Sequence, residues 1–247
     1  MGVSMSAETS GDKTILTGNI TVKSNEVQGI VCDAFCSDVP GGVGYVKVGT
    51  TINVTGKTDA CGIKFQYGNL NLEGAKITAK VSNKSSFAYA VLETGNDDSK
   101  GNTIALRKKS QLTGDIRAEG AEDTVIIESG SKLTGALSHV EKLILELNDQ
   151  AAKKSLWDIT ADLSDNTNLE IDFELGMTGD FVLAYNKSGA EWSGLFEDKI
   201  SLVFGDNSQY LFLSDVTTYG YDSLTYNDYD FTLKTKGSQL ILSVKGN

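Results

Sequence analysis

A 21-residue internal repeat constrains the fold of this chain more than any other feature. Residues 102–116 align with residues 123–137, and three apolar positions keep their character. Self-similarity at a fixed period is typical of architectures in which small units stack on one another. Five positions are identical: Thr103/Thr124, Ser110/Ser131, Leu112/Leu133, Thr113/Thr134 and Gly114/Gly135.

Short alternating segments extend this pattern upstream. Ile20–Val22 and Ile52–Val54 are each followed by a glycine-led apolar step, at Gly29–Ile30 and Gly62–Ile63, and residues 70–81 continue the alternation. Strands of about three to five residues cannot bury their apolar faces alone. Stacked as successive coils, they bury one continuous core and pair above and below, so we predict a parallel β-solenoid.

The glycine and proline contents favour an ordered chain with tight corners. Of the 247 residues 26 are Gly and one is Pro, whereas disordered chains are typically rich in Pro. Gly, Asn and Asp suit corners, and Pro is disfavoured wherever ladders use the backbone N–H. An antiparallel sandwich also has short alternating strands. We favour the solenoid over it for residues 12–147, because a sandwich does not predict the internal repeat.

The pattern changes after Leu147. Residues 200–204 and 210–213 flank a polar turn, and residues 229–234 and 239–244 flank Lys236-Gly237-Ser238, which predicts antiparallel hairpins. The last coil of a solenoid exposes unpaired strand edges that need a cover. We therefore expect solenoid coils over residues 12–148 and an antiparallel β-rich capping region, packed on the solenoid end, over residues 149–247.

The repeated segments resemble the passenger region of bacterial autotransporter-type surface proteins. The resemblance rests on Leu112–Ile116, Leu133–Leu137, the strand Asp123–Ile127 and the run Val140–Leu147, and it covers roughly residues 12–150. It implies an all-β fold, a right-handed β-solenoid (parallel β-helix), exported to the cell surface.

The net charge and the hydropathy of the chain limit the classes of partner that we expect. With 33 Asp+Glu against 22 Lys+Arg, the net charge is −11, so nucleic acid is not expected as a partner. No segment has the roughly 18 consecutive apolar residues of a membrane span, so we expect no membrane insertion by this segment. An acidic surface disfavours association through strand edges, and we expect a monomer.

We predict no catalytic residues. His139 is the single histidine, and the chain has no Gly-x-Ser-x-Gly motif for it to serve. Carboxylate candidates do exist, because some enzymes of this architecture cleave polysaccharides with Asp/Glu pairs or with Ca²⁺ and a basic residue. Solvated strand faces also explain these carboxylates, and we favour that interpretation. The candidates are Asp97, Asp98, Asp115 with Arg117 and Glu119, and Glu170, Asp172 and Glu174.

Neither a metal nor another cofactor is expected. Three cysteines without neighbouring histidines cannot complete a tetrahedral zinc site, and the Asp-rich segments 162–166 and 228–230 do not match the calcium-binding loop. Cys32 and Cys36 are candidates for a small disulfide loop if the protein is exported. The alternative is two free, partly buried thiols.

Aromatic residues gather in the C-terminal third of the chain. Trp157, Trp192, Tyr219 and Tyr221 are our candidate ligand-binding residues, because such rings stack on sugars and offer a polar edge; Tyr226 and Tyr229 lie nearby in sequence. The alternative is that they pack the core of the capping region.

We predict a non-enzymatic, extracellular or surface-displayed protein, adhesin-like or structural, whose partner is a host glycan or surface receptor. The alternatives are a polysaccharide lyase or glycoside hydrolase, and a carbohydrate-binding module.

Overall fold

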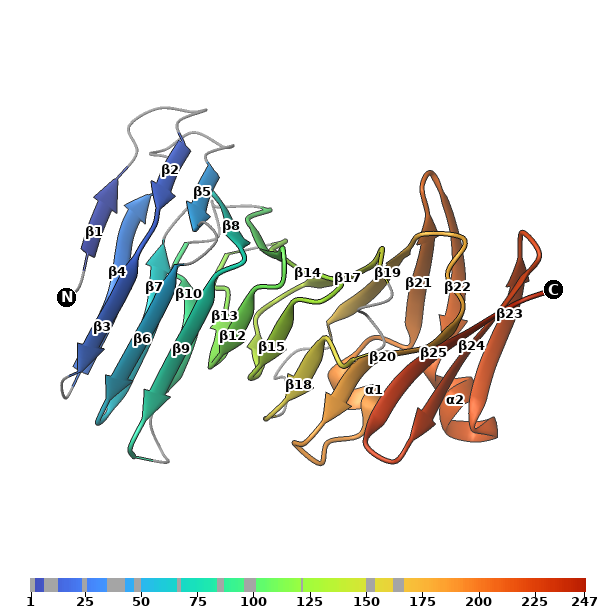
Figure 1. Ribbon diagram of the computed structural model, residues 1–247. Coiled ribbons are helices and arrows are strands. Elements are labelled where there is room, and N and C mark those ends of the chain that lie inside the picture. Colours follow the sequence, from blue (N-terminus) through green and yellow to red (C-terminus); the bar gives the residue numbers. More distant parts are fainter. Residues whose placement is uncertain are drawn as a thin grey trace.

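The protein is all-β, with two short helices, α1 (Trp192–Leu195) and α2 (Leu213–Tyr219) (Figure 1). Strands β1 and β23 lie at opposite ends of an elongated molecule. Neither helix is long or apolar enough to cross a membrane, and no other helix is present in the described residues. The computed structural model describes residues 3–6, 13–23, 26–34, 43–46, 50–65, 68–83, 87–95, 101–120, 122–149, 154–161 and 167–247.

The strands form three sheets, and up to β18 the chain visits them in turn. The first sheet has the order β1 (Val3–Ser6), β4 (Glu26–Ala34), β7 (Asp59–Phe65), β10 (Ala88–Glu93), β13 (Asp115–Arg117) and β16 (Leu137–Ser138). The second has the order β2 (Lys13–Leu16), β5 (Val43–Val46), β8 (Asn69–Glu73), β11 (Thr103–Arg107), β14 (Thr124–Glu128), β17 (Lys142–Leu147), β19 (Asn168–Phe173), β21 (Lys199–Phe204) and β22 (Asn207–Phe212). The third has the order β3 (Asn19–Lys23), β6 (Thr51–Gly56), β9 (Lys76–Val81), β12 (Gln111–Thr113), β15 (Lys132–Thr134), β18 (Trp157–Ile159), β20 (Gly179–Asn186), β25 (Gln239–Gly246), β24 (Tyr229–Lys236) and β23 (Tyr221–Tyr226).

The two copies of the repeat lie directly beside each other in all three sheets, as predicted. We call three successive strands, one in each sheet, a rung; β11–β13 and β14–β16 are two rungs. Every pairing between them keeps the 21-residue offset, and all are parallel. The partners include Ile104 with Val125, Leu112 with Leu133, and Ile116 with Leu137.

The upstream pattern is also confirmed. Ile20 pairs with Ile52 and Val22 with Val54 in the third sheet, and Ile30 pairs with Ile63 in the first. All pairs between the described strands of residues 12–147 are parallel, so the antiparallel sandwich is excluded for this part of the chain.

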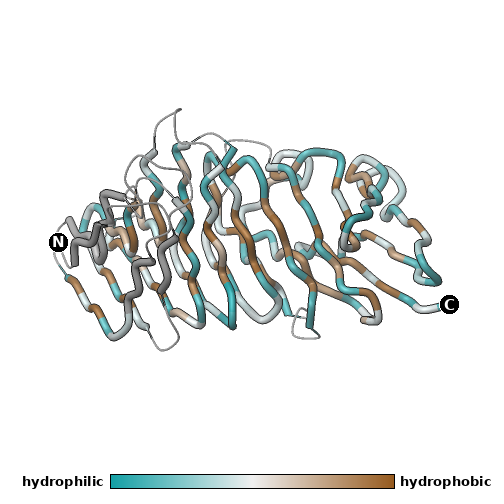
Figure 2. Tube along the Cα trace, turned by 90° about the horizontal axis from the view of Figure 1, so that it is seen from above, coloured by the Kyte–Doolittle hydropathy of each residue, from teal (hydrophilic) through white to brown (hydrophobic). Residues whose placement is uncertain are grey.

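Alternation along each strand sends one face into a single continuous core. Strand β17, for example, alternates between partly exposed and buried positions, with Leu143, Leu145 and Leu147 fully buried. Such buried residues form one cluster that runs from Ile52 to Val244. Figure 2 shows this as apolar bands that recur from one rung to the next along the molecule. Each rung therefore covers the apolar side chains of its neighbours.

Buried polar side chains hold the corners between strands. The N–H of Gly68 donates to Oδ1 of Asn102 (2.8 Å), and the N–H of Asn102 donates in turn to Oδ1 of Asp123 (2.9 Å). A similar bond lies at another corner, where the N–H of Ser110 donates to Oγ of Ser131 (3.1 Å). These bonds satisfy backbone groups that the sheets leave unpaired.

The glycines of the Leu-Thr-Gly steps allow the rungs to approach closely. A Cβ at Gly135 would lie 2.2 Å from the carbonyl oxygen of Gly114, and one at Gly114 would lie 2.8 Å from that of Ala88. Gly114 also has φ of +120°, in a region that favours glycine.

Parallel pairing continues beyond the boundary expected at 148/149. Strand β17 pairs in parallel with β19, β18 with β20, and β19 with β21. The predicted position of the change is therefore wrong, because β19 repeats the buried/exposed alternation of the rungs after a longer connection.

Antiparallel pairing begins with the hairpin β21–β22 and includes β20–β25, β24–β25 and β23–β24. Both predicted hairpins, at residues 200–213 and 229–244, are confirmed. The first sheet ends at β16, and Leu195 and Phe196 at the end of α1 belong to the core beyond it.

Candidate functional site

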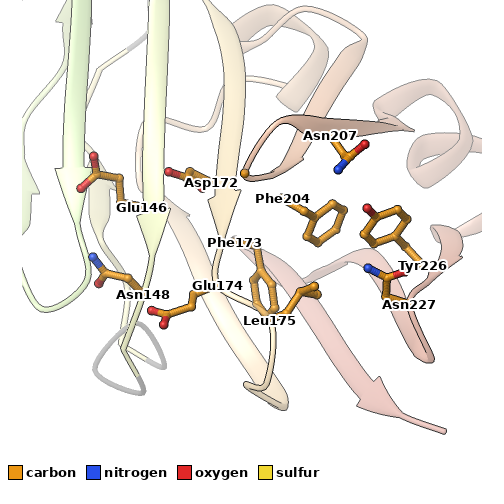
Figure 3. Close-up of a pocket in the computed structure, with 11 residues that line it drawn as sticks. Glu146, Asn148, Asp172, Phe173, Glu174, Leu175, Phe204, Asn207, Tyr226 and Asn227 are labelled. Atoms are coloured by element: carbon orange, nitrogen blue, oxygen red, sulfur yellow. The ribbon is translucent and has the colours of Figure 1, made fainter.

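A cavity of about 510 Å³ opens where the parallel strands meet the antiparallel hairpins (Figure 3). It lies between the ends of β17 and β19 on one side and the turns of β21–β22 and β23–β24 on the other. Its lining combines three carboxylates, three amides and three aromatic rings. The lining residues are Glu146, Asn148, Asp172, Phe173, Glu174, Leu175, Phe204, Gly205, Asn207, Tyr226 and Asn227.

The register of two parallel strands builds the acidic side of this cavity. Glu146 of β17 and Asp172 of β19 are direct partners in the ladder, so their side chains lie next to each other on the outer face. Glu174 follows Asp172 at a period of two, which places it on the same side. Figure 3 shows the three carboxylates together, opposite the aromatic rings.

An arginine holds Glu146 in place. Both terminal nitrogens of Arg107 donate to its carboxylate, at 2.5 and 2.8 Å, from β11 across the intervening strand β14. This is a bidentate ion pair, which fixes direction as well as charge. Asp172 and Glu174 are exposed and have no hydrogen bond or ion pair within the described residues, so they are available to a ligand.

The negative charges on the acidic side of the cavity affect the pKa of Asp172. Burial raises the pKa of Asp172 above its usual value, and the charges of Glu146 and Glu170 raise it further. Glu170 itself forms an ion pair with Lys142 (2.7 Å). A positively charged group beside Asp172 would relieve this repulsion.

The opposite side of the cavity is aromatic and is positioned by two tight turns. The rings of Phe204 and Tyr226 stack, with centroids 4.5 Å apart and planes 14° from parallel. Phe204 precedes a two-residue turn that begins with Gly205, at φ of +60°. Tyr226 precedes the turn Asn227-Asp228, in which both residues have positive φ, as in a type I′ hairpin.

Of the four aromatic residues predicted to bind ligand, none lines this cavity. Trp157 is fully buried, its ring packs edge-on against Phe196, and its Nε1 donates to the carbonyl oxygen of Gly135 (2.9 Å). The prediction for Trp157 is therefore wrong, because a ring with no exposed face cannot receive a sugar. Its neighbours Leu156 and Ile159 are also buried, which marks the whole segment as core.

The other three predicted residues have different environments. Trp192 is partly buried and stacks on Phe196, with 6.3 Å between centroids and 5° between planes. Tyr219 and Tyr221 are 71 % and 54 % exposed, at the end of α2 and the start of β23. Binding by these three residues stays a prediction.

The disulfide candidate lies partly outside the described residues. Cys36 is outside them, and Cys32 lies in β4, whose side chains are not described. Cys61 is a free thiol, and burial raises its pKa to about 12. Burial keeps this thiol protonated, so it serves as a small apolar group in the core.

The carboxylate candidates separate into three groups. Asp97 and Asp98 lie outside the described residues, and Asp172 and Glu174 line the cavity. Asp115 accepts a hydrogen bond from the N–H of Ala136 (2.7 Å), and burial raises its pKa. Beside it, Arg117 pairs with Glu119 (2.9 Å). Within the described residues, no group of three or more His, Cys, Asp or Glu is arranged to hold a metal ion.

Sequence reasoning missed eight of the eleven lining residues, which meet only through strand register and turns. Glu146 meets Asp172 at an offset of 26 residues, longer than the 21 of the visible repeat. The alternation of β17 and β19 carried the only available signal. The other missed residues are Asn148, Phe173, Leu175, Phe204, Gly205, Asn207 and Asn227.

No protein-family model matches the chain, and neither a curated protein nor a solved structure matches it.

Proposed function

We propose that this chain is a right-handed β-solenoid segment of an exported or surface-displayed protein, and that it binds carbohydrate without cleaving it. The in-register stacking of the rungs, in which the chain passes through three sheets in turn, supports the solenoid. The resemblance of residues 112–147 to autotransporter passengers supports export and a right-handed coil.

The observation that carries the binding role is the composition of one cavity. Carboxylate and amide groups accept from and donate to sugar hydroxyls, and a flat aromatic surface packs against the apolar face of a sugar ring. Asp172 and Asn207 supply the first kind of group, and Tyr226, whose ring is partly exposed and is backed by the buried ring of Phe204, supplies the second. At about 510 Å³ the cavity is in the range of small-ligand sites.

Glycan-array binding of the whole chain tests this proposal. We expect binding to at least one glycan, and we expect Asn207→Ala and Tyr226→Ala to weaken it about tenfold, because each removes a cavity contact. Asn207 is exposed at a turn, so its replacement leaves the core intact. Tyr210→Ala is the control, since Tyr210 is 43 % exposed, does not line the cavity and is not among the predicted binding residues. Equal loss in the control, or no binding at all, contradicts the proposal.

A polysaccharide-cleaving enzyme is the second candidate, favoured by one specific observation. Glycosidases use two carboxyl groups on either side of the scissile bond, one of them with a raised pKa. Asp172 has a raised pKa and lies beside Glu146, which forms an ion pair with Arg107. Release of reducing ends from a panel of neutral and acidic polysaccharides, abolished in Asp172→Asn, would favour this candidate. Binding without product favours the binding role.

A further inference from the structure

We propose that the cavity selects amino sugars, oligosaccharides that carry free, positively charged amino groups, over their neutral and acidic counterparts. This inference rests on the proposed carbohydrate binding and adds the chemical class of the ligand. It follows from the charges that line the cavity and from the absence of matching cations among the described residues.

The first step concerns the sign of the charge. Three of the eleven lining residues are acidic and none is basic. Arg107 lies behind Glu146 and is committed to it by two hydrogen bonds. Asp172 and Glu174 therefore have no basic partner in the described part of the chain. A uronic acid in this position would meet like charge, and a neutral sugar would leave both carboxylates uncompensated.

The second step concerns hydrogen-bond geometry. A protonated amine offers three donors and no acceptor, whereas carboxylates only accept. Asp172 lies in β19 and Glu174 directly follows that strand, and both line the cavity, so we expect a single ammonium group to donate to both. Such charge-assisted bonds are stronger than those between neutral groups.

The third step separates an amino sugar from a simple cation. The side opposite the carboxylates carries the ring of Tyr226, stacked on the buried Phe204, with the amides of Asn207 and Asn227 beside it (Figure 3). A sugar ring between the two sides places its apolar face on the ring of Tyr226 and its hydroxyls near the amides. A flexible polyamine would use the carboxylates alone.

Titration calorimetry with three probes tests the proposal at mildly acidic pH, where amino groups are protonated. The probes are a tetramer of glucosamine, the matching tetramer of N-acetylglucosamine, and spermidine. We expect the glucosamine tetramer to bind about tenfold more tightly than the N-acetylated one, and more tightly than spermidine. Its affinity should fall as salt is raised, because the attraction is screened.

Two variants identify the side chains responsible. Asp172→Asn with Glu174→Gln should remove the preference for the glucosamine tetramer while binding of the N-acetylated tetramer persists. Glu197→Gln with Glu191→Gln is the control of equal charge, since both of these glutamates are exposed and neither lines the cavity. It should leave the preference unchanged.

The outcomes distinguish this inference from the proposed function. Equal affinity for the two tetramers overturns the amino-sugar preference and leaves carbohydrate binding standing. Spermidine binding as tightly as the glucosamine tetramer overturns it as well, because the site is then a general cation site. No binding of either tetramer, together with an empty glycan array, overturns both.

Discussion

Two regions of the molecule differ in the side chains that pack their cores: the parallel rungs from β6 to β17, and the C-terminal part from β19 to β25. In the rungs the buried side chains are mostly aliphatic, and corners are closed by hydrogen-bonded ladders such as Asn102–Asp123. In the C-terminal part the core is also largely aliphatic but adds a cluster of aromatic rings, in which Phe173 packs edge-on against Phe181 and Phe231. The cavity lies where the second kind of packing begins.

This difference explains where a binding site can form. Each inner rung pairs with a neighbouring rung on both sides, so its side chains are fixed and no room remains between strands. Where the strands turn antiparallel, two hairpin turns project past the strand ends and leave a space lined by Tyr226 and Asn207. Regular stacking provides the rigid support, and its interruption provides the site.

The largest expected effect concerns a glycine in the rungs. Gly135→Ala would place a Cβ 2.2 Å from the carbonyl oxygen of Gly114, so two backbones must separate. We expect the free energy of unfolding to fall by at least about 3 kcal/mol, measured by urea unfolding. Gly194→Ala in α1 is the control, because no atom lies within 4 Å of its Cβ. A small effect of Gly135→Ala would show that the rungs are loosely packed.

A buried carboxylate pair gives the second effect, which depends on pH. Asp123 and Glu93 are 2 % and 0 % exposed, and Oδ2 of Asp123 has no hydrogen-bond partner in the described residues. Burial and then the charge of Glu93 raise the pKa of Asp123 to about 7. Asn102 occupies the equivalent place one rung earlier, with an amide in place of the carboxylate.

The sign follows from proton binding. The folded protein keeps a proton on Asp123 up to about pH 7, whereas the unfolded chain releases it near pH 4, so this stabilisation is present below pH 4 and is lost as the pH rises to 7. Asp123→Asn does not titrate. We expect it to match the wild type near pH 4 and to be about 2 kcal/mol more stable above pH 7 in urea unfolding.

Asp158→Asn is a control of opposite sign. Burial alone would raise the pKa of Asp158, but hydrogen bonds from Lys187 and Lys132 lower it below its usual value. Its ion pairs therefore stabilise the fold above about pH 4 and are lost as the pH falls through the lowered pKa. The cost of this substitution should be largest at neutral pH. The same pH trend in both variants would contradict the assignment.

The repeat predicted the rungs well because its signal is local. An alternating strand and a Leu-Thr-Gly step recur at one offset, and backbone pairing preserves that offset. A search for the 21-residue period does not find the other rungs, because the offset between paired residues is 34 from Leu70 to Ile104 and 18 from Val125 to Leu143. Loops of different length shift the spacing without changing the pairing.

The site could be predicted only in part. The alternation of β19 indicated that Asp172 and Glu174 share a face, but not that Glu146 joins them. Trp157 is a candidate ligand residue only because aromatic residues gather in that part of the chain, with core packing as the alternative, and the sequence alone does not distinguish a core indole from an exposed one. Tertiary packing, which the sequence does not reveal, brings the turns of β21–β22 and β23–β24 next to the ends of β17 and β19.

The smallest effect tests the link between the rungs and the cavity. Arg107→Gln removes a bidentate ion pair whose arginine side chain is 32 % exposed, so solvent screening limits the loss to about 1 kcal/mol. Lys142→Gln removes a single contact to Glu170 at similar exposure and should cost about half as much. Urea unfolding at low and high salt measures the cost of both variants.

The two variants should respond differently to salt. Arg107 also faces Glu73 and Glu128, so Arg107→Gln leaves like charges on neighbouring strands, and the cost of this substitution should fall more with added salt. Equal costs for the two variants at both salt concentrations would mean that Arg107 stabilises the fold as an ordinary surface charge, and that Glu146 is held at the cavity by the strand register alone.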